Sequence, residues 1–328
     1  PVLIIESDDW GPGPVEQAGA LRRITDILEK FTDCDGHRPV MTLGMILATA
    51  DGRETLSSGS YQRQKISART HGPLFDAIRD GVENRVFSIQ LHGMEHFWPP
   101  ALMSASKTDN AVIAWLNDGL ESVTEDLPSP LQSRWVDGSV LPAGRLDQKA
   151  VQQAVQQEVA TFKDIFGTIP SVVVPPTFIW NEDVEDAWAE AGAAVVVTPG
   201  RRFETRDSEG KPVASKTTFY NGQSGENGLI YLVRDVYFEP ALGHKAIQAV
   251  DALFSKTHLG RPALFETHRF NFLGAEEQNR QALAELERLL QMAVEEYPKL
   301  AFLSSGELAR LLKNRAPEWL ELRFRRGL

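Results

Sequence analysis

The sequence has little cysteine, no long hydrophobic run and fewer basic than acidic side chains. Its 328 residues include one cysteine, Cys34, which excludes an intramolecular disulfide and a cysteine-rich zinc module. Lys and Arg total 34 and Asp and Glu 45, so the formal net charge is −11. An acidic surface repels phosphate backbones, so we expect no nucleic acid as a partner. No apolar run approaches the roughly 18 residues of a membrane helix, so we expect no membrane span.

The chain also has no Pro/Ser-rich linker and no internal repeat, which predicts a single domain over residues 1–328. Residues 50–71 and 201–227 are polar and Gly-containing, and we expect them to be insertions in that domain. Pro1, not Met, opens the sequence directly before a strand-like run, so we expect a trimmed N-terminus. The sequence leaves an extracytoplasmic and a cytoplasmic location equally open, and it does not indicate the oligomeric state.

Short apolar runs alternate with amphipathic helical stretches along the whole chain. The predicted strands are residues 2–6, 39–47, 85–91, 171–174, 193–198, 229–233, 262–267 and 299–303. Their apolar runs are continuous, which is typical of strands buried on both faces. Strands alternating with helices predict a parallel α/β architecture. About eight strands in a chain of this length favour a barrel over an open sheet.

Two adjacent carboxylates, Asp8 and Asp9, follow the first predicted strand. Neighbouring strand side chains point to opposite faces unless the chain turns, and we expect residues 11–13 (Gly-Pro-Gly) to make that turn. Active sites of α/β barrels lie at the carboxyl ends of the strands, so the pair is a candidate for catalysis. The alternative is a helix N-cap beside a solvated acid.

Two histidines, His92 and His96, follow the third predicted strand. On a helical turn, positions four apart face the same side, and this spacing lets two imidazoles bind one metal ion. The alternative is two surface histidines that lie close by chance.

A third histidine, His268, ends a predicted buried strand and is followed by Arg269. An imidazole there can act as a general acid or base because its pKa lies near neutral pH. A core histidine bonded to the backbone is the alternative. Arg269 could hold a carboxylate or cap the loop.

A stiff loop at Pro175 and Pro176 follows the strand at 171–174. Prolines leave few free N–H groups, so the N–H of Thr177 is well placed to hold an oxyanion. We expect Pro176 to contact the substrate beside Thr177. An ordinary strand-to-helix turn is the alternative, and it is compatible with the same role.

Three tryptophans lie beside these motifs: Trp10, Trp98 and Trp180. Indole rings can stack on sugar rings, so each is a candidate platform for a glycan. Core packing is the alternative for each of them.

In this order the motifs resemble those of the NodB-homology polysaccharide deacetylases of carbohydrate esterase family 4. Residues 8–9 are similar to the second half of the family's Thr-Phe-Asp-Asp motif. Residues 92–96 match its His-x-x-x-His metal motif. Residues 175–177 stand where the family has Arg-Pro-Pro-Tyr, and residues 264–268 are similar to the last motif, which ends on a histidine. The resemblance covers nearly the whole chain.

The resemblance implies a deformed, NodB-like (β/α) barrel of about seven to eight parallel strands, formed as one domain by residues 1–328. It implies Asp8 as the catalytic base and His268 as the general acid. It also implies Asp9, His92 and His96 as ligands of one divalent metal. Zn²⁺ is the expected metal, with Co²⁺, Ni²⁺ and Mn²⁺ as alternatives.

The sequence departs from the family pattern in several places, among them the position before the two aspartates, where Glu6-Ser7 replaces Thr-Phe, and the positions after His268, where Arg269 and Asn271 stand instead of an aspartate. Val174 stands in the place of the arginine that supports the base, and Thr177 replaces a tyrosine. No clear Asp-x-x-Asp-Trp motif is present, and residues 234–239 are the nearest candidate. These departures bear on the substrate and on the tuning of Asp8 more than on the metal site.

The predicted function is metal-dependent removal of N- or O-acetyl groups from a glycan or oligosaccharide. Asp8 takes a proton from a metal-activated water, the Thr177 N–H stabilises the oxyanion, and His268 protonates the leaving group. One alternative is a metal-dependent amidohydrolase that acts on a small, non-glycan C–N bond. The other is a catalytically inactive glycan-binding homologue, for which the missing arginine at Val174 is the main reason. The sequence does not indicate which sugar or linkage is recognised.

Overall fold

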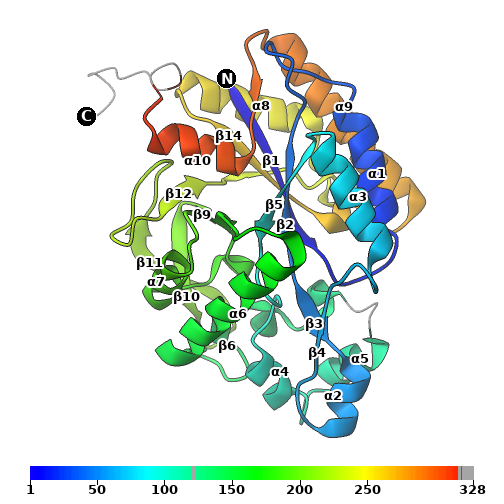
Figure 1. The fold of residues 1–328 in the computed structure, drawn as a ribbon, viewed down its shortest axis with the longest axis vertical. Helices are drawn as coiled ribbons and strands as arrows, with labels where there is room; N and C mark the ends of the chain where they lie inside the picture. Colours follow the sequence, from blue (N-terminus) through cyan, green and yellow to red (C-terminus); the bar gives the residue numbers. More distant parts are fainter. Residues whose placement is uncertain (120–122, 317–318, 320–328) are drawn as a thin grey trace.

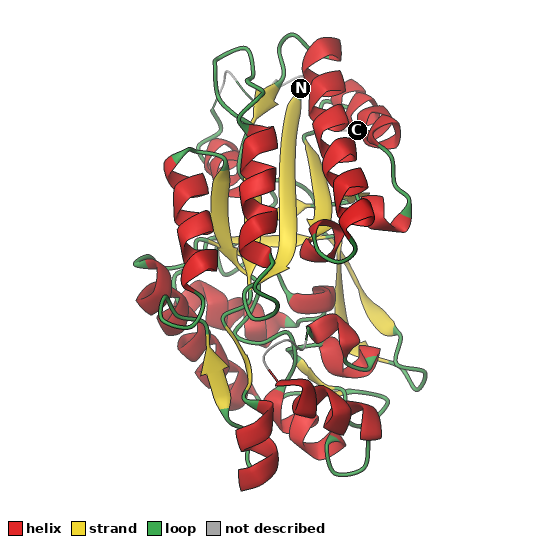
Figure 2. Ribbon diagram, turned by 90° about the vertical axis from the view of Figure 1, so that its right-hand side faces the viewer, coloured by secondary structure: helices red, strands yellow, loops and turns green. Residues whose placement is uncertain are grey.

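The computed structural model describes residues 1–119, 123–316 and 319. A sheet of parallel strands forms its centre, with helices packed against it (Figures 1 and 2). The strand order is β12-β9-β8-β5-β2-β1-β14-β13, and β15 also pairs with β1. The strands of this sheet are β1 (Val2–Trp10), β2 (Met41–Met45), β5 (Phe87–Leu91), β8 (Val172–Val173), β9 (Val195–Thr198), β12 (Ile230–Val233), β13 (Val236–Tyr237), β14 (Ala263–His268) and β15 (Ala301–Phe302).

The sheet confirms the predicted deformed (β/α) barrel, which stays open between β12 and β13 in the described residues. Each of the eight predicted strands contributes to the sheet. The prediction missed β13, because Val236 and Tyr237 are too short a run to stand out from the sequence around them.

Ten helices are described: α1 (Gln17–Leu28), α2 (Gly52–Ser58), α3 (Gly72–Glu83), α4 (Pro99–Ala105), α5 (Asn110–Asp118), α6 (Gln148–Phe166), α7 (Glu182–Glu190), α8 (Ala246–His258), α9 (Glu276–Glu296) and α10 (Ser305–Lys313). Helices α3, α1, α9 and α8 pack side by side in that order along one flank of the sheet (Figure 1). The longer helices have defined ends. In α6, the Asp147 side chain accepts from the Ala150 N–H, and Gly167 ends the helix in a left-handed conformation. In the described part of the chain, no helix combines the length and the apolarity needed to cross a bilayer.

The sheet is buried on both faces, which explains the continuous apolar runs of its strands. In β1, Leu3 and Ile5 belong to the large cluster under the helices, whereas Ile4 faces a second cluster on the opposite side. Leu308 of α10 belongs to that second cluster too, so this helix covers its end. Fully burying an aliphatic side chain of this size contributes about 1.5–3 kcal/mol.

Smaller elements lie beyond the carboxyl ends of the main strands. Strand β3 (Ala48–Ala50) pairs with β4 (Arg63–Lys65), and α2 lies between them in the segment predicted as the first insertion. Figure 1 places this pair with α2, α4 and α5 at the end of the molecule toward which β1 runs. The second predicted insertion forms the antiparallel pair of β10 (Arg201–Arg206) and β11 (Pro212–Thr218). A short pair, β6 (Val136–Asp137) and β7 (Gly144–Arg145), completes the described strands.

Candidate active site

An irregularity inside β1 brings Asp8 and Asp9 to the same cavity. The pairing of β1 with β2 shifts register between Ser7 and Trp10, and Asp9 has a φ of 73°. Residues with a side chain rarely adopt a positive φ, so the backbone is strained at this point. Such a bulge turns successive side chains toward one side of a strand. The predicted turn at residues 11–13 is therefore not what directs the side chains of Asp8 and Asp9 toward the cavity, because the irregularity in β1 comes before Trp10.

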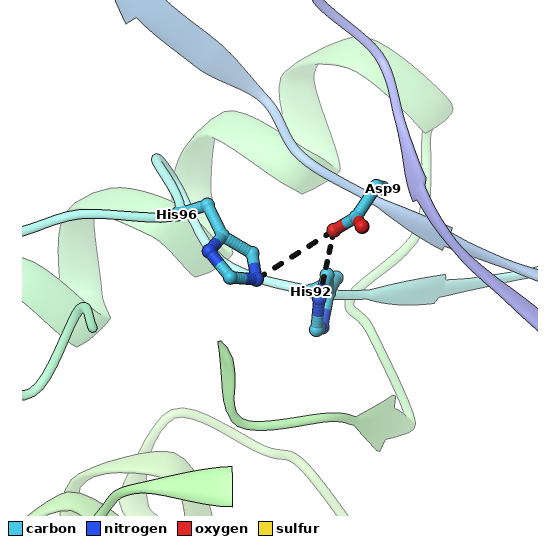
Figure 3. A group of neighbouring side chains, drawn as sticks. All are labelled: Asp9, His92 and His96. Carbon is cyan, nitrogen blue, oxygen red and sulfur yellow. Dashed lines mark ion pairs between the residues drawn. The ribbon is translucent and has the colours of Figure 1, made fainter. Parts of the chain in front are cut away.

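Asp9, His92 and His96 form a cluster that fits a divalent cation (Figure 3). Their ligand atoms all lie within 4.8 Å of one another. Asp9 Oδ1 is 3.3 Å from Nε2 of His92 and 3.6 Å from Nε2 of His96. This buried oxygen accepts no hydrogen bond from the described residues. Two imidazoles and one carboxylate are a common donor set for Zn²⁺ and related metals.

The two histidines reach Asp9 from a loop and not from the helical turn that their spacing predicted. The loop follows β5, and Gly93 within it has a φ of 107°. Nδ1 of His92 lies 3.0 Å from the Val174 carbonyl oxygen. Because a carbonyl only accepts, Nδ1 carries the proton, and a neutral ring then keeps the Nε2 lone pair for a metal.

Burial and charge set the protonation of this cluster. Burial opposes ionisation of Asp9, but the close approach of His92 and the charge of His96 outweigh it and lower the pKa of Asp9. Burial lowers the pKa of His96 to about 4, which keeps that imidazole neutral. For His92 burial acts in the same sense, but Asp8 and Asp9 outweigh it and raise the pKa of the ring.

Arg234, directly after β12, holds Asp8 in place. Its Nη2 donates to Asp8 Oδ2 at 2.6 Å, and its Nη1 donates to Glu6 Oε2 at 2.9 Å. Its Nε lies 3.2 Å from Glu266 Oε2. The prediction from Val174 that no arginine supports Asp8 is therefore wrong, because a different strand end supplies the guanidinium.

Three buried carboxylates share this one guanidinium. Burial raises the pKa of Asp8, but the charges of Arg234 and His92 prevail and lower it, so Asp8 is ionised. For Glu6 and Glu266, burial and the charge of Asp8 prevail over Arg234 and raise the pKa. Asp8 Oδ1 is buried and has no hydrogen-bond partner among the described residues, which leaves it able to accept a proton.

His268, at the end of β14, pairs in register with Asp8 on the neighbouring β1. Its Nδ1 lies 2.6 Å from Glu239 Oε1, and the side-chain amide of Asn271 also donates to Glu239. Burial would lower the pKa of His268, but the hydrogen bond to Glu239 and the charge of Asp9 raise it to about 10. The ring is therefore an imidazolium at neutral pH.

Thr177 has the strained backbone and the unused N–H that an oxyanion site requires. It lies in the short 3-10 turn η4 (Pro176–Phe178) with a φ of 56°. Its hydroxyl bonds to the Pro176 carbonyl and lies 2.9 Å from the Ser133 hydroxyl. Its backbone N–H donates to no group in the described part of the chain. Both prolines are buried, and Pro175 lines the cavity whereas Pro176 does not, so the predicted contact of Pro176 with substrate is wrong.

Two of the three predicted sugar platforms are core residues. Trp10 and Trp180 are both 0% exposed. The Trp10 indole donates to the Ser7 hydroxyl, and the Trp180 indole donates to the Glu185 carboxylate. The prediction that these two rings stack on sugar is therefore wrong. Trp98 is half-buried and lines a cavity apart from the active site.

Arg269 is buried and acts inside the protein. It donates to the Pro12 carbonyl at 2.6 Å and to Glu125 Oε2 at 3.2 Å. Of these groups only Glu125 lines the active-site cavity, so Arg269 holds a wall of the cavity and does not itself face substrate.

A single cavity of about 280 Å³ collects most of the predicted site residues. It is lined by Asp8, Asp9, His92, His96, Thr177 and His268, together with Arg234, Glu266, Tyr237 and other residues to which the sequence analysis assigned no role. Arg234 and Glu266 could have been found by the rule that found the others, since each lies at or near the carboxyl end of a strand. Glu239 carried no such signal, because it comes after the short strand β13.

The family model of glycosyl hydrolase family 57 matches residues 60–253, more than half of the chain. The chain belongs to glycosyl hydrolase family 57. The matched part of this family 57 member contains His92, His96, Thr177 and Arg234. Strands β1 and β14 lie outside the matched part.

Several solved structures are similar to this family 57 member at low identity. A 4-alpha-glucanotransferase from Thermococcus litoralis is 11% identical, with a TM-score of 0.45 over 94% of this chain and 40% of that one. A family 4 acetyl xylan esterase from Clostridium thermocellum, in complex with a cobalt ion, is 12% identical, with a TM-score of 0.43 over 95% and 91% of the two chains.

The peptidoglycan deacetylase PdaC from Bacillus subtilis is 13% identical, with a TM-score of 0.43 over 97% and 94% of the two chains. These structures include the class that the motifs resemble, but likenesses this distant do not bear on what the family 57 member does. None of the curated protein sequences compared with it matches.

Proposed function

We propose that this family 57 member is a metal-dependent hydrolase that removes N- or O-linked acetyl groups from a glycan. The observation that carries the proposal is the composition of one cavity. In that cavity Nε2 of His92 and Nε2 of His96 both approach Oδ1 of Asp9. The ionised carboxylate of Asp8 and the imidazolium of His268 line the same cavity.

The metal site is the cluster of Asp9, His92 and His96. A divalent metal bound by these three side chains supplies Lewis acidity, which makes a water more acidic and polarises an acyl carbonyl. The three protein ligands leave further coordination positions for water and substrate, as catalytic sites require.

Asp8 is the general base in this proposal. Its Oδ2 is taken by Arg234, so Oδ1 is the oxygen that accepts the proton of the attacking water. The guanidinium keeps Asp8 in one orientation and keeps it ionised at neutral pH. Removing such a base typically lowers kcat by about 10²–10⁴-fold.

His268 is the general acid, and Thr177 stabilises the oxyanion. The Nδ1–H of His268 donates a hydrogen bond to Glu239, so the proton on Nε2 is the one that goes to the leaving amine or alcohol. Thr177 lines the same cavity, and its unused N–H is the donor that we assign to the oxygen on which negative charge develops.

The proposed substrate class rests on the family and on the cavity wall. Membership in a glycosyl hydrolase family favours a carbohydrate. Tyr237 is 54% exposed and lines the cavity, so its ring is available to pack against a sugar.

The test is acetate release from acetylated xylan and from N-acetylglucosamine oligomers, each with added divalent metal. The wild type is expected to release acetate from one of them, and Asp8→Asn is expected to lower kcat by about 10²–10⁴-fold. Asp35→Asn is a matched control, because Asp35 is exposed and lies outside the cavity. Equal rates in Asp8→Asn and the wild type would remove Asp8 from the mechanism.

Cleavage of a glycosidic bond is the second candidate, and the family match favours it. The cavity contains Asp8 and Glu266, whose pKa values are displaced in opposite directions, as in an acid and base pair of a glycosidase. Reducing-end release from malto-oligosaccharides in the presence of a chelator, without acetate release, would establish this candidate. Glycan binding with neither product would favour an inactive homologue, and amide hydrolysis of small molecules alone would favour the non-glycan amidohydrolase.

A further inference from the structure

A second cavity, of about 210 Å³, shares no lining residue with the active-site cavity. Its walls include Arg63 at the start of β4, Trp98 directly before α4, and Arg134 before β6. Gln153 and Gln157 line it from one face of α6. The proposed hydrolysis uses none of these five side chains, so it does not account for this cavity.

Arg134 is a buried and rigidly held guanidinium. Its Nη1 donates to Glu95 Oε2 at 2.5 Å, and its Nε lies 3.4 Å from Glu158 Oε2. The guanidinium carbon lies over two indole rings, 5.9 Å from the centre of Trp98 and 5.3 Å from that of Trp135. Its other terminal nitrogen, Nη2, has no hydrogen-bond partner among the described residues.

Arg63 is held through the same carboxylate. Its Nε donates to Glu95 Oε1, and its Nη1 donates to Gln157 Oε1 at 2.8 Å. A further side-chain hydrogen bond joins Arg63 to Tyr61. Two fixed guanidinium groups therefore line one cavity, and Nη2 of Arg134 is the nitrogen that remains unused among the described residues.

The charges around the cavity favour an anion. Among the described residues, Glu95 is the only carboxylate that both arginines share, and it is fully buried. The second carboxylate near Arg134, Glu158, has its pKa raised by burial, which weakens its countercharge. Positive charge therefore exceeds negative charge here, in a chain whose formal net charge is −11.

The remaining walls suit a sugar ring. Trp98 offers part of an indole surface, and the side-chain amides of Gln153 and Gln157 supply donors and acceptors for hydroxyl groups. The volume lies below the about 300–1,000 Å³ of pockets that hold drug-sized ligands, so it suits a single ring rather than a longer chain.

We propose that this cavity binds one carboxylate-bearing sugar residue of a glycan, with the carboxylate at the guanidinium groups of Arg134 and Arg63 and the ring against Trp98. Planar guanidinium groups match carboxylate oxygens in geometry and in charge. The choice of a glycan as ligand rests on the proposed function, but binding at this cavity requires no hydrolysis.

The test is calorimetric titration of the metal-loaded protein with glucuronate and with glucose. Glucuronate is expected to bind at least tenfold more tightly than glucose, and added salt is expected to weaken it. Gln153→Phe places a ring in the cavity and is expected to weaken glucuronate at least tenfold. Gln156→Phe is the matched control, because Gln156 is exposed on the same helix but does not line the cavity.

Arg63→Gln gives a second test that leaves the cavity open. It removes one guanidinium and is also expected to weaken glucuronate at least tenfold, with glucose unchanged. Equal binding of glucuronate and glucose, or equal effects of the two phenylalanine variants, would overturn the proposal. Inorganic sulfate that binds as tightly as glucuronate and competes with it would show an anion site without sugar recognition, and would also overturn it.

These outcomes are separate from those of the proposed function. Glucuronate binding without acetate release from any substrate would contradict the proposed deacetylase activity and support the second binding site. Acetate release without glucuronate binding would support the deacetylase activity and contradict the second binding site.

Discussion

Arg234 donates from Nη2 to Asp8 Oδ2 at 2.6 Å, although the two residues are 226 positions apart in the chain. The contact forms because β12 and β1 belong to one curled sheet whose strand ends face a common cavity. It leaves Oδ1 as the only oxygen of Asp8 that can act on a water. The space around Oδ1 is therefore a sensitive point of the site.

Gly44→Ala is expected to abolish most activity without unfolding the protein. Gly44 lies on β2 opposite Asp8, and a Cβ at this position would stand 2.2 Å from Asp8 Oδ1. The carboxylate must then move away from Arg234 and from the attacking water. A misplacement of about 1 Å can cost about 10²-fold in rate, so kcat is expected to fall by that order.

Steady-state kinetics and circular dichroism of the same preparation check this expectation. Gly72→Ala is the control, because a Cβ at Gly72 would meet no atom within 4 Å. A Gly44→Ala variant with wild-type kcat would show that the position of Asp8 Oδ1 does not matter.

The alkaline limit of activity is expected above the ordinary pKa of histidine. A general acid must be protonated, and although burial lowers the pKa of His268, its hydrogen bond to Glu239, which is not a metal ligand, raises it. The groups that raise this pKa are the carboxylates of Glu239, Asp9 and Asp8. Glu239→Gln removes the nearest of these charges, so the alkaline limb of kcat is expected to move to lower pH by at least about one unit.

The measurement is kcat against pH at saturating metal, for the wild type and Glu239→Gln. Glu276→Gln serves as the control, because Glu276 is an exposed residue outside the cavity. A wild-type limb near pH 7, or a limb that Glu239→Gln leaves in place, would remove His268 from the role of acid.

Glu6→Gln is expected to stabilise the protein at alkaline pH. The folded state keeps a proton on Glu6 to higher pH than the unfolded chain does, because its pKa is raised. The wild type therefore loses stability as the pH rises above about 4.3, the ordinary pKa of Glu. A neutral amide at position 6 can still accept from Arg234 and avoids this loss.

The expected gain at pH 8 is on the order of 1 kcal/mol in the free energy of unfolding, and it should shrink toward pH 4. Urea unfolding at both pH values measures it. A variant that is less stable than the wild type at pH 8 would show that Arg234 needs all three carboxylates.

The sheet could be predicted from the sequence because its strands are buried on both faces. Burial on two sides requires continuous apolar runs, such as residues 229–233, and such runs are visible without any knowledge of the fold. The bulge at Asp9 could not be predicted. Its positive φ arises from the way β1 pairs with β2, and no glycine at that position marks it in the sequence.

The site could be predicted only in part, for a related reason. Strand ends identified Asp8, Asp9, His92, His96 and His268 as candidates, and the structure brings them into one cavity. The support that Arg234 gives to Asp8 depends on strand order, which the spacing of residues does not reveal. Likewise, the position of Trp10 beside a motif indicated nothing about its burial, which is complete.

The metal content of the purified protein shows whether Asp9, His92 and His96 hold the metal on which the proposed hydrolysis depends. Plasma mass spectrometry is applied to the wild type, His92→Ala and His258→Ala after incubation with Zn²⁺, Co²⁺, Ni²⁺ or Mn²⁺ and removal of excess ion. His258 is the matched control, because it lies on α8 outside the cavity. We expect one bound ion per chain in the wild type and in His258→Ala, and no bound ion in His92→Ala. A wild type that takes up no ion, or a His92→Ala variant that keeps it, would show that Asp9, His92 and His96 do not form a metal site.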